Sequence, residues 1–116
     1  MSGDRMRRVD EAMREVLSAA ITSELKDPRV GFVTVTSVDT APDLRQARVF
    51  VSVLGTDPER RRSLDALRSA HGYLQRRVAD QLRLRHTPTL DFVYDDTAER
   101  AQRIETLLER EAPERE

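Results

Sequence analysis

Residues 60–92 read RRRSLDALRSAHGYLQRRVADQLRLRHTPTLDF and contain two helical patterns separated by a break. Apolar residues recur at helical spacing on each side, so each half predicts an amphipathic helix. They are Leu64, Leu67 and Ala70 before the break and Leu74, Val78 and Leu82 after it. A glycine within a continuous helix costs roughly 0.5–1 kcal/mol relative to alanine. We therefore expect a kinked helix pair, with Ala70, His71 and Gly72 at the kink.

The arginines of this segment avoid the two apolar faces. At about 100° per residue, Arg61 and Arg68 share one side of the first helix. Arg76 and Arg83 lie opposite the apolar residues of the second helix. Guanidinium groups match phosphate oxygens in two-point geometry, so this pattern favours contact with RNA. The predicted contact residues are Arg61, Arg68, Arg76, Arg77, Arg83 and Arg85, extended by Arg5 and Arg8 near the amino end.

The charge of the chain is polarised although its net charge is only −1. Residues 57–86 hold eight arginines against four carboxylates, whereas residues 91–116 hold four arginines against nine carboxylates. Local charge governs attraction to a polyanion, because the Debye length is about 8 Å at physiological salt. The alternative is that these arginines only solvate a helix surface, beside Asp57, Glu59, Asp65 and Asp80.

The rest of the chain predicts a small α+β domain. An apolar stripe from Val9 to Ile21 predicts a first helix over residues 5–26, which Asp27-Pro28 ends. Residues 31–39 and 44–54 alternate in polarity and predict an antiparallel hairpin. Phe32 and Phe92 are both assigned to the core.

Three further features complete the predicted order of elements. Asp57 is the expected N-cap of the kinked pair, with Pro58 at its first helical position. Leu90, Phe92 and Tyr94 alternate with Asp91, Val93 and Asp95 and predict a short third strand. Because helices separate it from the second strand, it can pair parallel to a strand of the hairpin. Asp96-Thr97-Ala98-Glu99 predicts a capping box that opens a last helix.

A length of 116 residues predicts one domain, which we place at residues 1–109, followed by a charged, disordered tail at residues 110–116. The absence of cysteine excludes disulfides and thiolate metal sites and suits a reducing cytoplasm. No apolar run is long enough for a signal segment or a membrane span. We expect a soluble, cytoplasmic protein.

The sequence predicts no catalytic, cofactor or metal site. His71 and His86 are too far apart for a zinc motif, and His71 is expected to face solvent in the bend. Strand alternation and helix capping account for Asp91, Asp95 and Asp96 without chemistry. No phosphate-binding loop or nucleophile elbow occurs. An enzyme is therefore not expected.

Several short motifs stand in a fixed order between Arg5 and about Leu108. The weaker ones are Arg8-Val9, Asp27-Pro28-Arg29, Thr34-Val35-Thr36 with Val38, and Asp43-Leu44 with Ala47. The most specific are Ala70-His71-Gly72 and Leu84-Arg85-His86-Thr87-Pro88 with Leu90, Phe92 and Asp95. Together, in this order, these motifs resemble the ribosome-binding factor A family. The resemblance implies a type II KH-like fold in which an Ala-x-Gly kink replaces the Gly-x-x-Gly loop of ordinary KH domains.

The resemblance also implies a function. Members of this family assist late maturation of the 30S subunit, 16S rRNA processing and cold adaptation by binding free or immature 30S near the 5′-terminal helix of 16S rRNA. Because no Gly-x-x-Gly occurs here, we expect shape and phosphate contacts rather than a clamp on a single strand. We expect a monomer with no cofactor and no small-molecule substrate. The alternative is an adaptor that docks on a ribosomal protein or self-associates without touching RNA.

Overall fold

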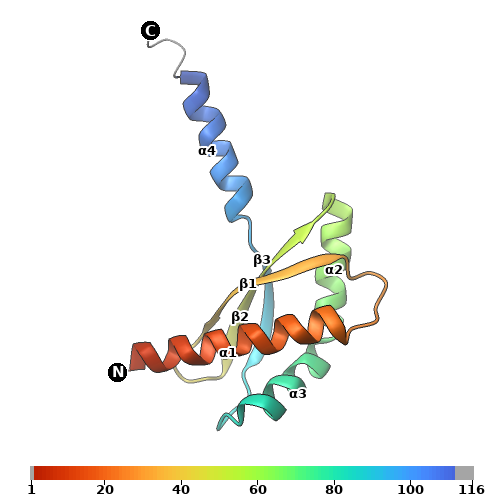
Figure 1. The fold of residues 1–116 in the computed structure, drawn as a ribbon, viewed down its shortest axis with the longest axis vertical. Helices are drawn as coiled ribbons and strands as arrows, with labels where there is room; N and C mark the ends of the chain where they lie inside the picture. Colours follow the sequence, from red (N-terminus) through yellow and green to blue (C-terminus); the bar gives the residue numbers. More distant parts are fainter. Residues whose placement is uncertain (1, 112–116) are drawn as a thin grey trace.

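The computed structural model describes residues 2–111. It contains a three-stranded sheet with three helices packed on one face and a fourth helix that extends beyond the sheet (Figure 1). The elements in chain order are α1 (Ser2–Ser23), β1 (Phe32–Thr40), β2 (Gln46–Leu54), α2 (Asp57–Ser69), α3 (His71–Leu82), β3 (Thr89–Tyr94) and α4 (Thr97–Glu111). The predicted α+β order is confirmed.

The sheet has the strand order β1-β2-β3. β1 and β2 are antiparallel, and β3 lies parallel to β2 with Val49 opposite Phe92. The predicted hairpin and the predicted parallel third strand are therefore both confirmed. The register of β1 shifts between Val35 and Ser37, so Thr36 is an extra residue at a bulge. The Thr36 hydroxyl lies 2.7 Å from Asp95 Oδ2, which joins β1 to the end of β3.

One face of the sheet forms the core. Ala47, Val49, Val51 and Val53 of β2 are all buried there, as the alternation predicts. Phe92 is buried, but Phe32 is 79% exposed, so its assignment to the core was wrong. Phe32 precedes Val33 in the strand and therefore points to the opposite, open face, where it pairs with Leu54 of β2. The apolar core comprises Met13, Leu17, Ala20, Ile21, Val35, Val38, Ala47, Val49, Val51, Val53, Leu64, Leu67, Leu74, Val78, Leu90 and Phe92.

The helix ends differ from the predicted ones by a few residues. α1 ends at Ser23, three residues earlier than expected, and the N–H groups of Glu24 and Leu25 both donate to Ala20 O. The N-cap of α2 is Thr56 rather than Asp57. The Glu59 backbone N–H donates to Thr56 Oγ1 and the Thr56 backbone N–H donates to Glu59 Oε1, at 3.3 and 2.8 Å. This reciprocal capping box fixes the cap one residue earlier.

α4 begins with a different cap from the predicted one. The Thr97 backbone N–H donates to Asp95 Oδ1 at 2.9 Å, while Glu99 Oε2 accepts from the Tyr94 hydroxyl instead of capping. Hydrogen bonds from Thr97 and Thr36 hold the pKa of Asp95 below its ordinary value. Arg110 and Glu111, the first two residues of the predicted tail, are helical, and residues 112–116 lie outside the described part of the chain.

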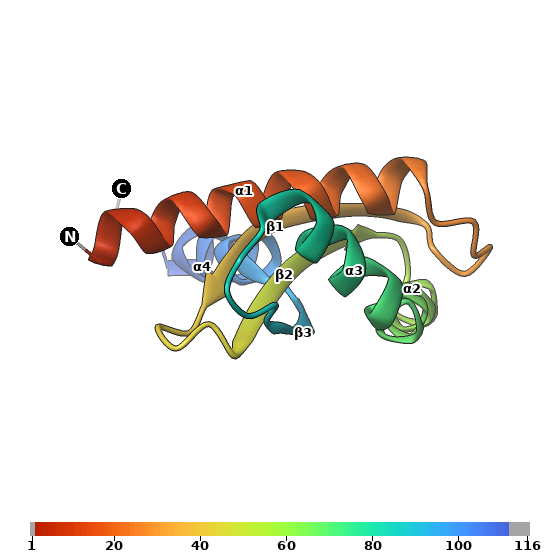
Figure 2. The ribbon, with the colours of Figure 1, turned by 90° about the horizontal axis from the view of Figure 1, so that it is seen from below.

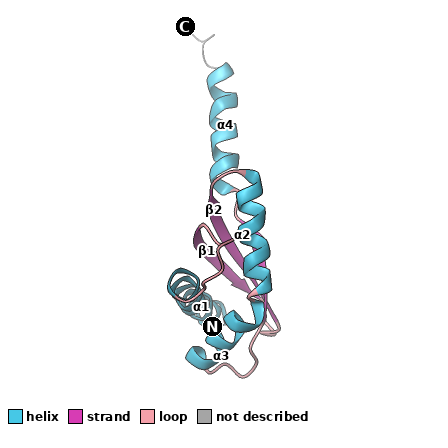
Figure 3. Ribbon diagram, turned by 90° about the vertical axis from the view of Figure 1, so that its right-hand side faces the viewer, coloured by secondary structure: helices cyan, strands magenta, loops and turns pink. Residues whose placement is uncertain are grey.

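α4 extends away from the domain, as Figures 1 and 3 show. Its apolar stripe is exposed: Ile104 is 58%, Leu107 59% and Leu108 64% accessible. The carboxylates of this helix are carried away from the sheet with it. α4 also leaves the surface of α1, α2 and α3 uncovered.

Candidate nucleic-acid interface

The predicted kink is centred on Ala70. This residue ends α2 and precedes α3, with φ −88° and ψ 9°, in the bridge region rather than the helical region. Its N–H still bonds Ala66 O and its carbonyl still accepts from Leu74 N–H, both at 3.0 Å. The bend lets α2 pack on β2 and β3 while α3 packs on α1, and Figure 2 shows α3 beside α1.

Gly72 lies in the first turn of α3 and is exposed. Its φ lies outside the left-handed region. A Cβ added to it would meet only the Arg76 Nη1, at 4.0 Å. The fold itself therefore does not require glycine here, and the bare backbone faces outward at the start of a helix.

The amino end of α3 has features that suit an anion. Ala70 is the N-cap of α3. Among the described residues, no side chain caps the first turn of this helix, and that turn contains no acidic residue. The first N–H groups of a helix carry a partial positive charge, which attracts phosphate. His71, predicted to face solvent, is half-buried, and its Nε2 is covered without a partner among residues 2–111.

Six of the eight predicted arginines have no carboxylate oxygen within 4 Å among the described residues. All six are exposed. Their charges are therefore available to a polyanion. They are Arg5 and Arg8 of α1, Arg61 of α2, Arg76 of α3, and Arg83 and Arg85 of the segment that leaves α3.

Arg68 is partly engaged within the protein. Its Nη2 donates to the Phe92 carbonyl at 3.0 Å, and its Nη1 lies 4.0 Å from Asp65 Oδ1. The side chain remains 54% exposed. Arg68 therefore ties α2 to β3 and still presents charge at the surface.

Arg77 is held by α1. Its Nε lies 3.0 Å from Glu24 Oε1, at the turn after α1. Tyr73 donates a hydrogen bond to the same carboxylate, and this bond raises the pKa of Tyr73 above its ordinary value. The sequence placed Arg77 in the RNA-contacting set, whereas the structure gives its guanidinium a partner within the fold.

The structure places the remaining arginines in two groups. Arg5 and Arg8 lie across a groove from the segment 82–85, which carries Arg83 and Arg85. Arg61 lies on α2, before the kink, and Arg76 lies beside Gly72, after it. The groove between α1 and the end of α3 was not foreseen. It joins residues more than seventy positions apart, and the only local signal was the alternation of leucine and arginine at residues 82–85.

The acidic and histidine residues form no centre for metal chemistry within residues 2–111, where no group of three His, Asp or Glu side chains converges. Asp95 is engaged by Thr36 and Thr97, and Asp96 pairs with Arg100 at 3.0 Å. None of the helices in the described range is both long and apolar enough to cross a bilayer.

The fold and this surface define a KH-like domain of type II with a basic, bent helix pair. The family model for ribosome-binding factor A matches residues 5–108. A ribosome-binding factor A from Anaeromyxobacter sp. is 50% identical over 105 residues, which cover 90% of this chain and 86% of that protein. The chain belongs to the ribosome-binding factor A family, a family of non-enzymatic maturation factors of the 30S ribosomal subunit.

Solved structures agree with this assignment. The crystal structure of ribosome-binding factor A from Thermus thermophilus matches with a TM-score of 0.68 and 26% identity, covering 77% of this chain and 94% of that one. A homology model of Thermus thermophilus ribosome-binding factor A, fitted into a cryo-EM map of its complex with 30S, matches with a TM-score of 0.63 and 26% identity. It covers 76% of this chain and 92% of the fitted chain.

Proposed function

We propose that this chain binds free or immature 30S subunits near the 5′-terminal helix of 16S rRNA and assists late maturation and 16S rRNA processing. The observation that carries the proposal is the set of six exposed arginines without carboxylate partners among residues 2–111. They lie on α1, α2, α3 and the segment after α3. The Thermus thermophilus relative fitted into a 30S complex supports the same partner.

The kink gives the surface a defined shape. Arg76 lies beside the exposed backbone of Gly72, and the uncapped first turn of α3 adds N–H donors close by. A phosphate can accept from both at once, since a guanidinium and helix N–H groups are complementary to its oxygens. α4 extends away from this surface, and Glu99, Glu105 and Glu109 belong to that helix.

The mechanism follows from differential affinity. A factor that binds one arrangement of rRNA more tightly than another shifts the population toward the arrangement it prefers. We propose that this chain prefers an immature rRNA arrangement and leaves when that arrangement is lost. We extend the proposal to a monomeric, cytoplasmic protein, to which the family resemblance adds a contribution to cold adaptation.

Co-sedimentation with 30S subunits, repeated with protein-free 16S rRNA fragments, tests the proposal. We expect binding to 30S and also to the naked fragments, because phosphates are the ligands of the arginines. Binding to 30S without any binding to naked rRNA would instead support an adaptor that docks on a ribosomal protein. Absence of binding to either would overturn the proposed function.

A further inference from the structure

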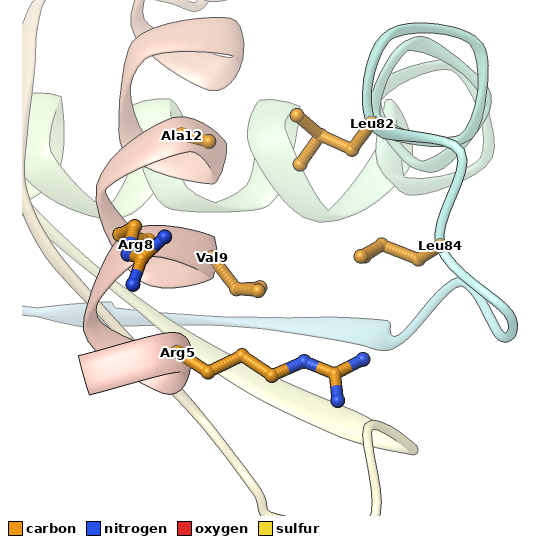
Figure 4. A pocket seen from close by; sticks show the side chains of 6 residues that line it. All are labelled: Arg5, Arg8, Val9, Ala12, Leu82 and Leu84. Carbon is orange, nitrogen blue, oxygen red and sulfur yellow. The ribbon is translucent and has the colours of Figure 1, made fainter. Parts of the chain in front are cut away.

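A pocket of about 490 Å³ lies between the amino-terminal half of α1 and the segment that leaves α3. Its volume falls within the roughly 300–1,000 Å³ typical of small-ligand pockets. Figure 4 shows Val9 and Leu84 pointing toward each other from opposite walls. The residues that line it are Arg5, Arg8, Val9, Ala12, Leu82 and Leu84.

The floor of the pocket is apolar and its rim is cationic. Val9, Ala12, Leu82 and Leu84 present only carbon atoms from their side chains. Figure 4 shows Arg5 reaching from α1 across one end toward the segment that carries Leu84.

The carboxylates of α1 next to the pocket are engaged elsewhere. Asp4 lies 3.4 Å from Arg7, Glu11 accepts from Arg14, and the Asp10 carboxylate accepts from the Thr40 N–H at 3.0 Å. Arg5 and Arg8 therefore keep their charges without a carboxylate partner among the described residues. On the opposite side, Arg83 and Arg85 flank Leu84 in the sequence and are exposed, although they do not line the pocket.

We propose that this pocket binds one unpaired nucleotide of the small-subunit rRNA, with the base against the apolar floor and the flanking phosphates on the arginines of the rim. This inference rests on the proposed function and names the feature of rRNA that the protein selects. A base that is paired and stacked within a duplex has no free apolar face to offer. An unstacked base has such a face, and its own backbone supplies the anionic charge that the rim complements.

An unpaired nucleotide in the pocket explains how a basic surface distinguishes immature rRNA from mature rRNA. Phosphates are present in paired and unpaired strands alike, so the arginines alone do not discriminate between them. The pocket accepts a base only where pairing is incomplete. It therefore favours rRNA that has not reached its final fold.

Two hairpin RNAs test the proposal, one with a single bulged 2-aminopurine and one fully paired. We expect the wild-type chain to bind the bulged hairpin about tenfold more tightly, or about 1.4 kcal/mol, and the 2-aminopurine fluorescence to change on binding. Equal affinity for the two hairpins would overturn the inference. If salt-dependent binding to 30S persisted in that case, the proposed function would stand without it.

Ala12→Phe fills the pocket and leaves every arginine in place. We expect it to abolish the preference for the bulge while leaving affinity for the paired hairpin unchanged. Leu84→Ser removes part of the floor without filling it, and its preference should fall in the same way. Ala101→Phe on the exposed face of α4 is the matched control and should behave as wild type.

The same variants also test whether the pocket instead holds a segment of a ribosomal protein. If Ala12→Phe weakened binding to 30S but kept the preference for the bulged hairpin, the pocket would hold a segment of a ribosomal protein, and the inference would be wrong. An unchanged preference in both Ala12→Phe and Leu84→Ser, with melting temperatures close to wild type, would also overturn it.

Discussion

The guanidinium of Arg77 lies 3.0 Å from the carboxylate of Glu24, whereas the neighbouring Arg76 is exposed and has no carboxylate partner among residues 2–111. Successive residues of α3 therefore have different roles. We expect Arg77→Ala to lower the free energy of unfolding by about 1 kcal/mol, since it breaks an ion pair that is two-thirds buried. Thermal melting measures this loss, which corresponds to roughly 4 °C.

Arg76→Ala is the matched variant and should leave the melting temperature unchanged. Its affinity for 30S subunits should fall roughly fivefold, or about 1 kcal/mol, if Arg76 contacts one phosphate. A stability loss in Arg76→Ala, or normal stability in Arg77→Ala, would contradict the assignment of these two roles.

Gly72→Ala tests whether the glycine is required for folding or for binding to 30S subunits. The residue is helical, and an added Cβ would lie 4.0 Å from its nearest neighbour. We expect the free energy of unfolding to rise by about 0.4–1 kcal/mol, because alanine favours the helix and restricts the unfolded chain. Affinity for 30S should fall if rRNA approaches the bare backbone there.

Gly55→Ala is the control for that substitution. Gly55 has φ +138°, and a Cβ there would lie 2.8 Å from Glu59 Oε1. We expect a clear loss of thermal stability, in contrast to Gly72→Ala. Destabilisation by Gly72→Ala as large as that by Gly55→Ala would show that the kink itself requires glycine.

The hydrogen bonds of Asp95 predict that the free energy of unfolding depends on pH in the acidic range. Hydrogen bonds from Thr97 and Thr36 lower the pKa of Asp95 in the folded state. The stabilisation is therefore present above the unfolded value of about 3.9 and is lost as the pH falls through the folded value. We expect Asp95→Asn to be less stable than wild type at neutral pH, with the difference shrinking below pH of about 4 in urea unfolding measured across that range. A difference that stayed constant with pH would exclude this role.

Most of the fold is predictable from sequence, because each element carries a local signal. Helical spacing around Leu64 and Leu74 predicted α2 and α3, and the small residues between them marked the kink. Valine alternation in β2 predicted the buried face. Phe32 was wrongly assigned to the core, although its alternation with Val33 places it on the open face.

The candidate site is less predictable, because partners distant in sequence decide which charges are available. Glu24 engages Arg77 across 53 positions, and Asp10 accepts from the Thr40 N–H across 30 positions. The spacing of residues along the sequence does not predict either contact. It also does not show that Val9 and Leu84 face each other across a pocket.

The salt dependence of affinity for 30S subunits measures how many ribosomal phosphates the arginines contact. We expect log K to fall linearly with log salt, by roughly 0.7–0.9 for each phosphate contact. For Arg76→Ala with Arg83→Ala the slope should be shallower by about 1.4–1.8. Arg48→Ala with Arg100→Ala, which removes two arginines paired with Asp39 and Asp96, should keep the wild-type slope. Affinity independent of salt, or an unchanged slope in the first variant, would contradict the claim that these arginines bind ribosomal phosphates.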